Sequence, residues 1–165
     1  MILDREATPD PEDRARQLGA RVGVACSVVG LLIAQAFLTI ISTMDGNWKI
    51  AFFWFVDVDY LFNIIVGVAG LLFTSWRVGA WGGRAILISG ANCVLIGIIT
   101  ALTTLLVGTF FGSCVGFLQE GLVKQALGGA LYDYLVKPVL LIGLVGFLPC
   151  LGLGVAFGVA VRSLK

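Results

Sequence analysis

Histidine is absent from the chain, and charged residues are few. Only 13% of the 165 residues are charged, whereas 59% are hydrophobic. Without histidine the chain lacks the usual general base near neutral pH, the commonest metal ligand and the proximal ligand of most haems. Soluble domains are about 25% charged and about 45–50% apolar. The composition therefore indicates a membrane protein, and it argues against catalysis, metal binding or a haem cofactor.

The chain also lacks a strong net charge and any cysteine pair. The net charge of +1 gives no overall field that would attract a nucleic acid. None of the four cysteines forms a CxxC pair, so we expect them to be small apolar packing residues: Cys26, Cys93, Cys114 and Cys150. We expect no cofactor, no metal site and no nucleic-acid partner.

The first 21 residues do not have the pattern of a secretory signal, in which an apolar core directly follows a short basic patch. They are polar and mixed in charge. Asp10 followed by Pro11 is typical of a helix start, with Asp10 as N-cap and Pro11 in the first turn. We expect a short amphipathic surface helix that leads into the first membrane span.

Long apolar runs occupy most of the chain. A spanning helix needs about 20 apolar residues, and four runs meet this length without any lysine or arginine. They cover residues 22–44, 50–76, 85–111 and 139–161. The sequence therefore predicts an all-α bundle of four transmembrane helices. It forms a single transmembrane domain over residues 22–161, after a polar segment (1–21) and before a short tail (162–165).

The basic residues predict the orientation of this bundle. From Arg14 onward, seven fall on the side of both termini, and three fall on the other side. The first group is Arg14, Arg16, Arg21, Arg77, Arg84, Arg162 and Lys165, and the second is Lys49, Lys124 and Lys137. The positive-inside rule then places both termini on the cytoplasmic, matrix or stromal side of a plasma membrane or an organelle inner membrane.

The third connection, residues 112–137, is unusually apolar. Its leucines recur at helical spacing from Leu118 to Leu135, and Gly128–Gly129 interrupts them. Short helices lying in the outer interface explain this pattern. A re-entrant hairpin is the alternative, and it requires protein or water around its unpaired backbone groups. We favour the interfacial interpretation.

Small residues are spaced for close helix packing. In lipid, helices associate through close packing and hydrogen bonds, and small residues let their backbones approach. The predicted packing positions are Gly19, Gly23, Ser27, Gly30, Ala34, Gly67, Gly70, Gly97, Ala101, Gly154 and Gly158. Pro149 lies in the middle of the fourth span, where its ring should kink the helix.

Polar residues in the spans are the candidate functional residues. Asp59, Asn63, Gly67, Gly70 and Thr74 share one helix face in the second span. An ionisable residue inside a membrane suggests function by default. Asp57 points about 200° away from Asp59, so the two cannot form a side-by-side carboxylate pair. Gln35 and Asn92 are the uncharged polar candidates, expected to hold helices together.

The depth and role of the two aspartates stay open at this point. If the helix enters lipid at Ile50, Asp59 lies about 13 Å deep. If Trp48 to Trp54 occupy the interface, both carboxylates lie just below the headgroups, and we favour this second case. Three roles stay open for Asp59: a structural carboxyl that is paired with a lysine or hydrogen-bonded, an ion or proton site, or a contact with another subunit.

Two main functions fit these features. The first is a non-catalytic accessory, structural or assembly subunit, which packs with other membrane subunits or with itself in the bilayer. The second is a small ion, proton or solute channel or carrier subunit that uses the Asp/Asn stripe of the second span. An enzyme is the weakest hypothesis, because no nucleophile and base are spaced to act together.

Overall fold

The computed structural model describes residues 10–43, 61–121 and 127–164, which are almost entirely helical and contain no strand. Four helices are long and apolar enough to cross a membrane, which indicates a membrane protein. They are α1 (Pro11–Ser42), α3 (Leu61–Leu87), α4 (Cys93–Gly116) and α7 (Lys137–Ser163). Three short elements lie between α4 and α7, namely the π-helix η2 (Phe117–Gly121), α6 (Leu127–Leu131) and the π-helix η3 (Tyr132–Val136).

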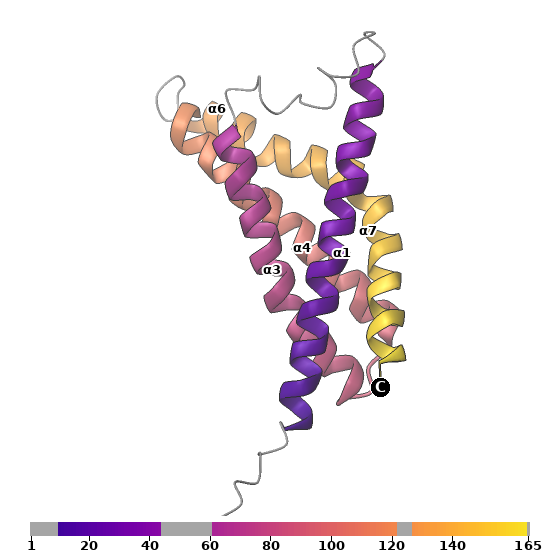
Figure 1. The fold of residues 1–165 in the computed structure, drawn as a ribbon. Helices are drawn as coiled ribbons and strands as arrows, with labels where there is room; N and C mark the ends of the chain where they lie inside the picture. Colours follow the sequence, from indigo (N-terminus) through magenta and orange to yellow (C-terminus); the bar gives the residue numbers. More distant parts are fainter. Residues whose placement is uncertain (1–9, 44–60, 122–126, 165) are drawn as a thin grey trace, which may run out of the picture.

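The four long helices pack in chain order. α3 lies between α1 and α4, and α4 lies between α3 and α7, whereas α1 and α7 contact each other much less. The start of α1 and the end of α7 lie at the same end of the bundle, at the bottom of Figure 1. We call this the arginine end, because Arg14, Arg16, Arg84 and Arg162 belong to the helix termini there.

α1 is longer than its predicted span. The predicted cap is confirmed, since the Glu12 backbone N–H donates a 3.2 Å hydrogen bond to Asp10 Oδ1. Glu12 and Asp13 also place negative charge in the first turn, which stabilises a helix N-terminus. The expected surface helix and the first span form one continuous helix from Pro11 to Ser42.

The turn between α3 and α4 lies further along the chain than the predicted span boundaries place it. α3 continues past the predicted end at Trp76 and past Gly82 and Gly83 to Leu87. Gly90 supplies the left-handed backbone of the turn, with φ of 67°. Asn92 then caps α4, because its Oδ1 accepts hydrogen bonds from the backbone of Val94 (3.0 Å) and Leu95 (3.3 Å).

The described part of the third connection is helical. η2 follows α4 directly, and η3 runs directly into α7, while residues 122–126 lie outside the described residues. α7 bends in its middle, where its first half runs across the bundle and its second half descends toward the arginine end (Figure 1). Pro149 lies inside this helix, as the sequence predicts for a kink.

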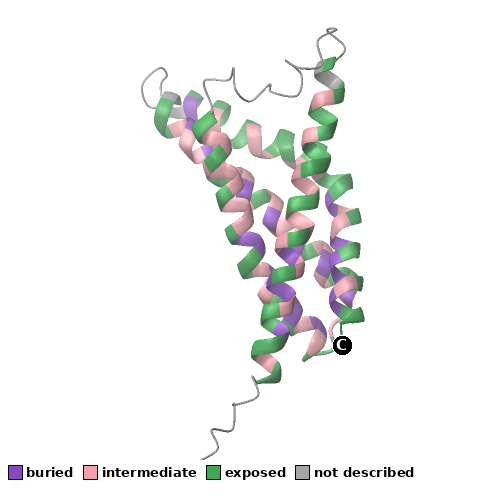
Figure 2. Ribbon diagram, viewed as in Figure 1, coloured by how far each residue is buried: buried purple, intermediate pink, exposed green. Residues whose placement is uncertain are grey.

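Buried residues lie along the helix seams, while the outside is apolar and exposed (Figure 2). The main cluster of buried apolar side chains is near the arginine end and joins α3, α4 and α7: Ile86, Cys93, Phe157 and Val161. Large exposed apolar residues on all four helices, such as Leu32, Phe62, Leu95 and Leu144, fit contact with lipid.

Candidate functional site

The seam between α1 and α3 is built from small residues on both helices. A Cβ atom added to Gly83 would lie 2.5 Å from the carbonyl oxygen of Ala15 and 2.7 Å from Gly19 Cα. A Cβ on Gly23 would lie 2.8 Å from the carbonyl oxygen of Ser75. The backbones of α1 and α3 are therefore in contact, and no side chain larger than that of glycine fits at these positions. This contact brings the Ser27 and Ser75 hydroxyls within hydrogen-bond distance, at 2.8 Å.

The seam between α4 and α7 has the same design near the arginine end. A Cβ on Gly154 would lie 2.7 Å from Ile98 Cα, and one on Gly97 would lie 3.0 Å from the Gly158 nitrogen. Further along, the Cys150 thiol donates to the carbonyl oxygen of Ala101 at 3.5 Å. The Gly154 and Gly158 pair therefore packs inside this chain, against α4.

The predicted stripe on the second span faces α4 where it is described. Gly67 packs against Gly112, since a Cβ on Gly67 would lie 3.4 Å from Gly112 Cα. Gly70 contacts Phe111, and the Asn63 amide lies beside Gly116. Asp57 and Asp59 lie outside the described residues, so Asn63 and the buried Thr74 are the polar members of the stripe that the structure describes.

The two other polar candidates, Gln35 and Asn92, have different surroundings. Gln35 is partly buried in α1, where its side-chain nitrogen donates to Thr39 Oγ1 at 3.4 Å and its backbone carbonyl accepts from the same hydroxyl at 2.8 Å. Asn92 was expected inside a span, but it is the exposed N-cap of α4. The expectation was wrong because the helix starts later than the apolar run does.

Of the remaining predicted packing positions, one contacts another helix and one is exposed. Gly30 contacts Leu153 of α7, with 3.0 Å between an added Cβ and the leucine Cδ1. Ala34 is exposed. Several packing glycines were missed, namely Gly79, Gly82, Gly83, Gly108, Gly112, Gly116, Gly143 and Gly146. Their four-residue spacing in Gly79–Gly83 and Gly108–Gly112 was a usable signal.

Three polar side-chain atoms are buried without a hydrogen-bond partner in the part of the chain that the structure describes. They are Asn63 Oδ1, Thr100 Oγ1 and Thr104 Oγ1. Asn63 lies at the α3–α4 seam, and Thr100 of α4 faces Gly82 of α3 and approaches Phe157 of α7. Unpaired buried polar groups are uncommon and invite an explanation. Two of these three atoms therefore belong to α4, and the third belongs to the α3 residue that faces it.

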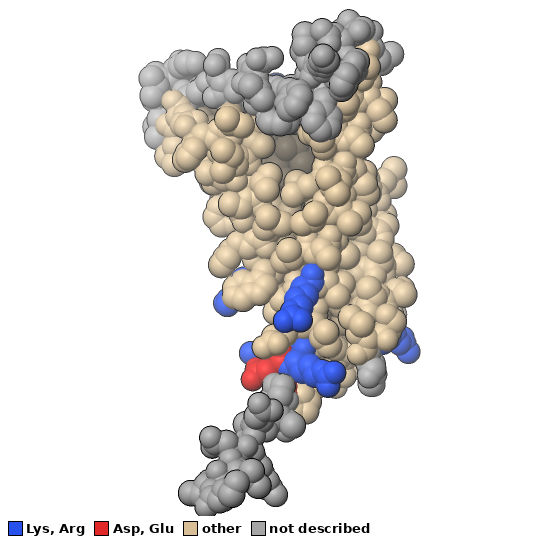
Figure 3. All heavy atoms as spheres, in the orientation of Figure 1, with Lys and Arg blue, Asp and Glu red and all other residues tan. Residues whose placement is uncertain are grey.

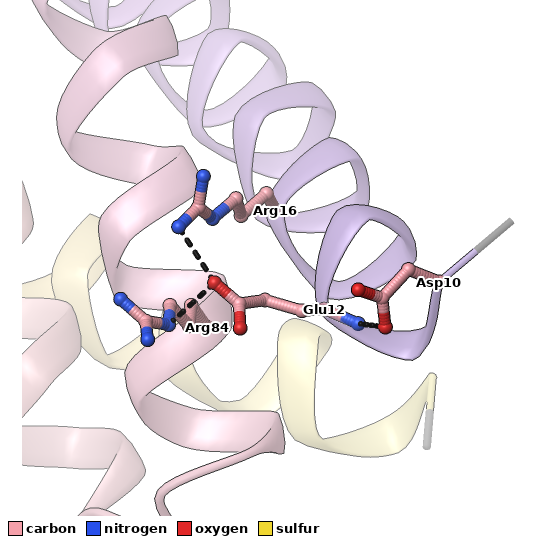
Figure 4. A network of polar contacts seen from close by, with 4 residues as sticks. All are labelled: Asp10, Glu12, Arg16 and Arg84. Atoms are coloured by element: carbon pink, nitrogen blue, oxygen red, sulfur yellow. Dashed lines mark hydrogen bonds and ion pairs between the residues drawn. The ribbon is translucent and has the colours of Figure 1, made fainter.

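A charge network joins α1 to α3 at the arginine end (Figure 4). Glu12 Oε1 accepts from Arg16 Nη2 at 2.6 Å and from Arg84 Nε at 3.0 Å. These side chains are a third to a half exposed. At that exposure each pair contributes roughly 0–1 kcal/mol, so the network positions the helix ends more than it stabilises them.

On the side of α7 that points away from the bundle, the small residues Gly152 and Ala156 lie between the larger Leu148 and Val159. Gly152 is exposed, and an added Cβ there would meet nothing within 4 Å, unlike at any other glycine of the four long helices. Ala156 and Val159 are also exposed, and they lie four and seven residues further along. This spacing puts all three on one helix face, opposite the face that packs on α4. We call Gly152, Ala156 and Val159 the outer α7 face.

The described residues contain no group of three or more cysteine, aspartate or glutamate side chains placed to hold a metal ion. No protein-family model matches the sequence, and no curated protein or solved structure matches it. What the described residues can do is therefore inferred from their packing and their charges.

Proposed function

We propose that this protein is a non-catalytic accessory, structural or assembly subunit, which packs through its helices with other membrane subunits or with a second copy. The observation that carries the proposal is the outer α7 face. Lipid tails are as apolar as leucine, so a small-residue face gains nothing from contact with lipid. It does allow the backbone of another helix to approach closely.

The rest of α7 supports this role. Gly154 and Gly158 already pack on α4, so the helix has small residues on two faces, of which one is used within the chain. The exposed surface of the other helices carries mostly large side chains, as on α3 with Phe62, Ile65 and Phe73. Large side chains of this kind suit lipid contact.

The test is Gly152→Leu, compared in mild-detergent extracts of native membranes by blue-native separation and mass identification. The wild-type chain is expected to travel with partner subunits or as a homo-oligomer, and Gly152→Leu should release it. The fold should survive, because nothing in the described part of the chain lies within 4 Å of the added Cβ. Ala69→Leu is the matched control, since Ala69 is exposed on the α3 face that carries Phe62 and Phe73.

Either of two results would overturn the proposal. One is a wild-type chain that stays monomeric and cross-links to no neighbour in its native membrane. The other is equal release by Gly152→Leu and Ala69→Leu, which would mean that the outer α7 face has no special part in assembly.

The second candidate function is a small channel or carrier subunit for an ion, a proton or another solute. The observation that favours it is the set of unpartnered buried polar atoms along α4, which includes Asn63 Oδ1 of the Asp/Asn stripe. Its distinguishing test is Asp59→Asn. Transport predicts that this substitution abolishes flux in proteoliposomes while assembly stays intact, and unchanged flux would remove the hypothesis.

A further inference from the structure

Three arginines lie where the apolar part of a helix meets its polar part. Arg21 directly precedes the first apolar run, Arg77 directly follows Trp76, and Arg162 directly follows the last apolar run. All three are exposed. They belong to three different helices, α1, α3 and α7. We call these three residues the boundary arginines.

The packing places Arg21 and Arg77 at a similar depth. Gly23 of α1 packs against Ser75 and Gly79 of α3, which lie on either side of Arg77 in the sequence. Arg77 is therefore level with Gly23, only two residues from Arg21. On α7, Arg162 follows Val161, which clusters with Ile86 of α3 and Cys93 of α4, so Arg162 lies nearer the tip of the arginine end.

Arg21 and Arg77 point away from the helix seams. Arg21 is two residues from both Gly19 and Gly23, so it lies on the side of α1 opposite the α3 contact. Arg77 is two residues from Ser75 and Gly79, so it lies on the side of α3 opposite α1. Figure 3 shows basic side chains projecting from the arginine end, below a surface free of charge.

No carboxylate neutralises the boundary arginines within the described ranges. Glu12 is engaged with Arg16 and Arg84, which lie nearer the tip of the arginine end. Arg162 contacts only the neutral Cys93 thiol, with 3.8 Å from Nη1 to Sγ. The guanidinium carbon of Arg77 lies 5.9 Å from the centre of the Trp76 ring, a cation–π contact that leaves the charge in place.

We propose that Arg21, Arg77 and Arg162 bind the phosphates of anionic phospholipid headgroups. The planar guanidinium fork matches the oxygens of a phosphate. The half-exposed Trp76 and Trp81 rings lie on the same part of α3, and tryptophan is enriched at the headgroup level. An anionic headgroup brings the negative charge that the described part of the chain does not supply to these three residues. A zwitterionic headgroup offsets its phosphate with its own cation.

The test measures which lipid surrounds the arginine end. The full chain is reconstituted in nanodiscs of phosphatidylcholine with a small fraction of either brominated phosphatidylglycerol or brominated phosphatidylcholine. Bromine quenches tryptophan emission on contact. A Trp48→Phe/Trp54→Phe background restricts the emission to Trp76 and Trp81, since the chain has four tryptophans.

Brominated phosphatidylglycerol should quench more strongly than brominated phosphatidylcholine at equal fraction. Each arginine replaced by glutamine should weaken the preference by roughly fivefold, following the typical contribution of a basic residue near an anionic surface. The triple variant Arg21→Gln/Arg77→Gln/Arg162→Gln should lose the preference. Arg16→Gln is the matched control and should keep it, because Arg16 is paired with Glu12.

Equal quenching by the two lipids in the parent chain would overturn the proposal, whether or not any variant folds. A preference that persists in a triple variant with unchanged helical circular dichroism would also overturn it. So would an equal loss in Arg16→Gln, because the effect would then follow total charge instead of the boundary arginines.

Discussion

The Ser27 hydroxyl of α1 donates a hydrogen bond of 2.8 Å to the Ser75 hydroxyl of α3. Ser75 is almost completely buried, at 1% exposure. The contact depends on the glycines beside it, because Gly23 packs directly against the Ser75 backbone. Close backbone packing and a polar link between helices therefore occur together on this seam.

We predict a small, measurable coupling between these two serines. Hydrogen bonds between membrane helices contribute about 0.6 kcal/mol on average. A double-mutant cycle with Ser27→Ala, Ser75→Ala and the double variant should give a coupling of this size in the free energy of unfolding in bicelles. Additive effects of the two single substitutions would show that the bond does not contribute to stability.

The second prediction concerns Gly83. Gly83→Ala places a Cβ 2.5 Å from the Ala15 carbonyl oxygen and 2.7 Å from Gly19 Cα, and both neighbours are backbone atoms that no side-chain rotation can move. α1 and α3 must therefore separate. We expect a loss of about 1–3 kcal/mol in the free energy of unfolding, the usual range for overpacking.

Gly152→Ala is the matched comparison for Gly83→Ala. Both substitutions add one methyl group to a helical glycine and gain up to about 1 kcal/mol of helix propensity. An added Cβ at Gly152 meets no atom of residues 10–43, 61–121 or 127–164 within 4 Å. In the isolated, detergent-purified protein Gly152→Ala should be neutral or slightly stabilising. Equal destabilisation by the two substitutions would contradict the packing argument for Gly83.

Helix existence and part of the packing could be predicted from the sequence. Long apolar runs predict helices wherever the membrane requires internal backbone hydrogen bonding. The spacing of Gly19 and Gly23, and of Gly154 and Gly158, predicts close contacts, which the structure contains. The spacing alone did not identify the partner helices. Which two helices pack together depends on which small residues face each other, and the tertiary fold determines this.

Boundaries near charged residues were harder to predict. Gly79 and Gly83 lie between Arg77 and Arg84, so the hydropathy pattern ended the span before them. The helix continues because Arg77 is exposed and Arg84 pairs with Glu12. The hydropathy pattern also misplaced Asn92, which was put inside a span because its neighbours in the sequence are apolar. The Ser89–Gly90 turn just before it was the local signal that it caps a helix.

The third prediction concerns the bend in α7. Proline at position 149 has no backbone N–H, so it cannot donate to the carbonyl of Val145, and its ring crowds that turn. Pro149→Ala restores the donor and should straighten the helix. Val159 lies 18 residues after Leu141, so a straight helix separates them by about 27 Å. Spin labels at these two exposed positions, in a background without native cysteines, should report a longer distance in Pro149→Ala than in the parent.

Leu148→Ala is the control for the bend, because it changes the neighbouring exposed side chain and keeps the Pro149 ring. It should leave the distance distribution unchanged. If Pro149→Ala also left the distribution unchanged, the bend would have to come from packing on α4. The contacts of Gly143 with Leu106 and of Gly146 with Leu105 would then be the next to alter, since they hold the first half of α7 against α4.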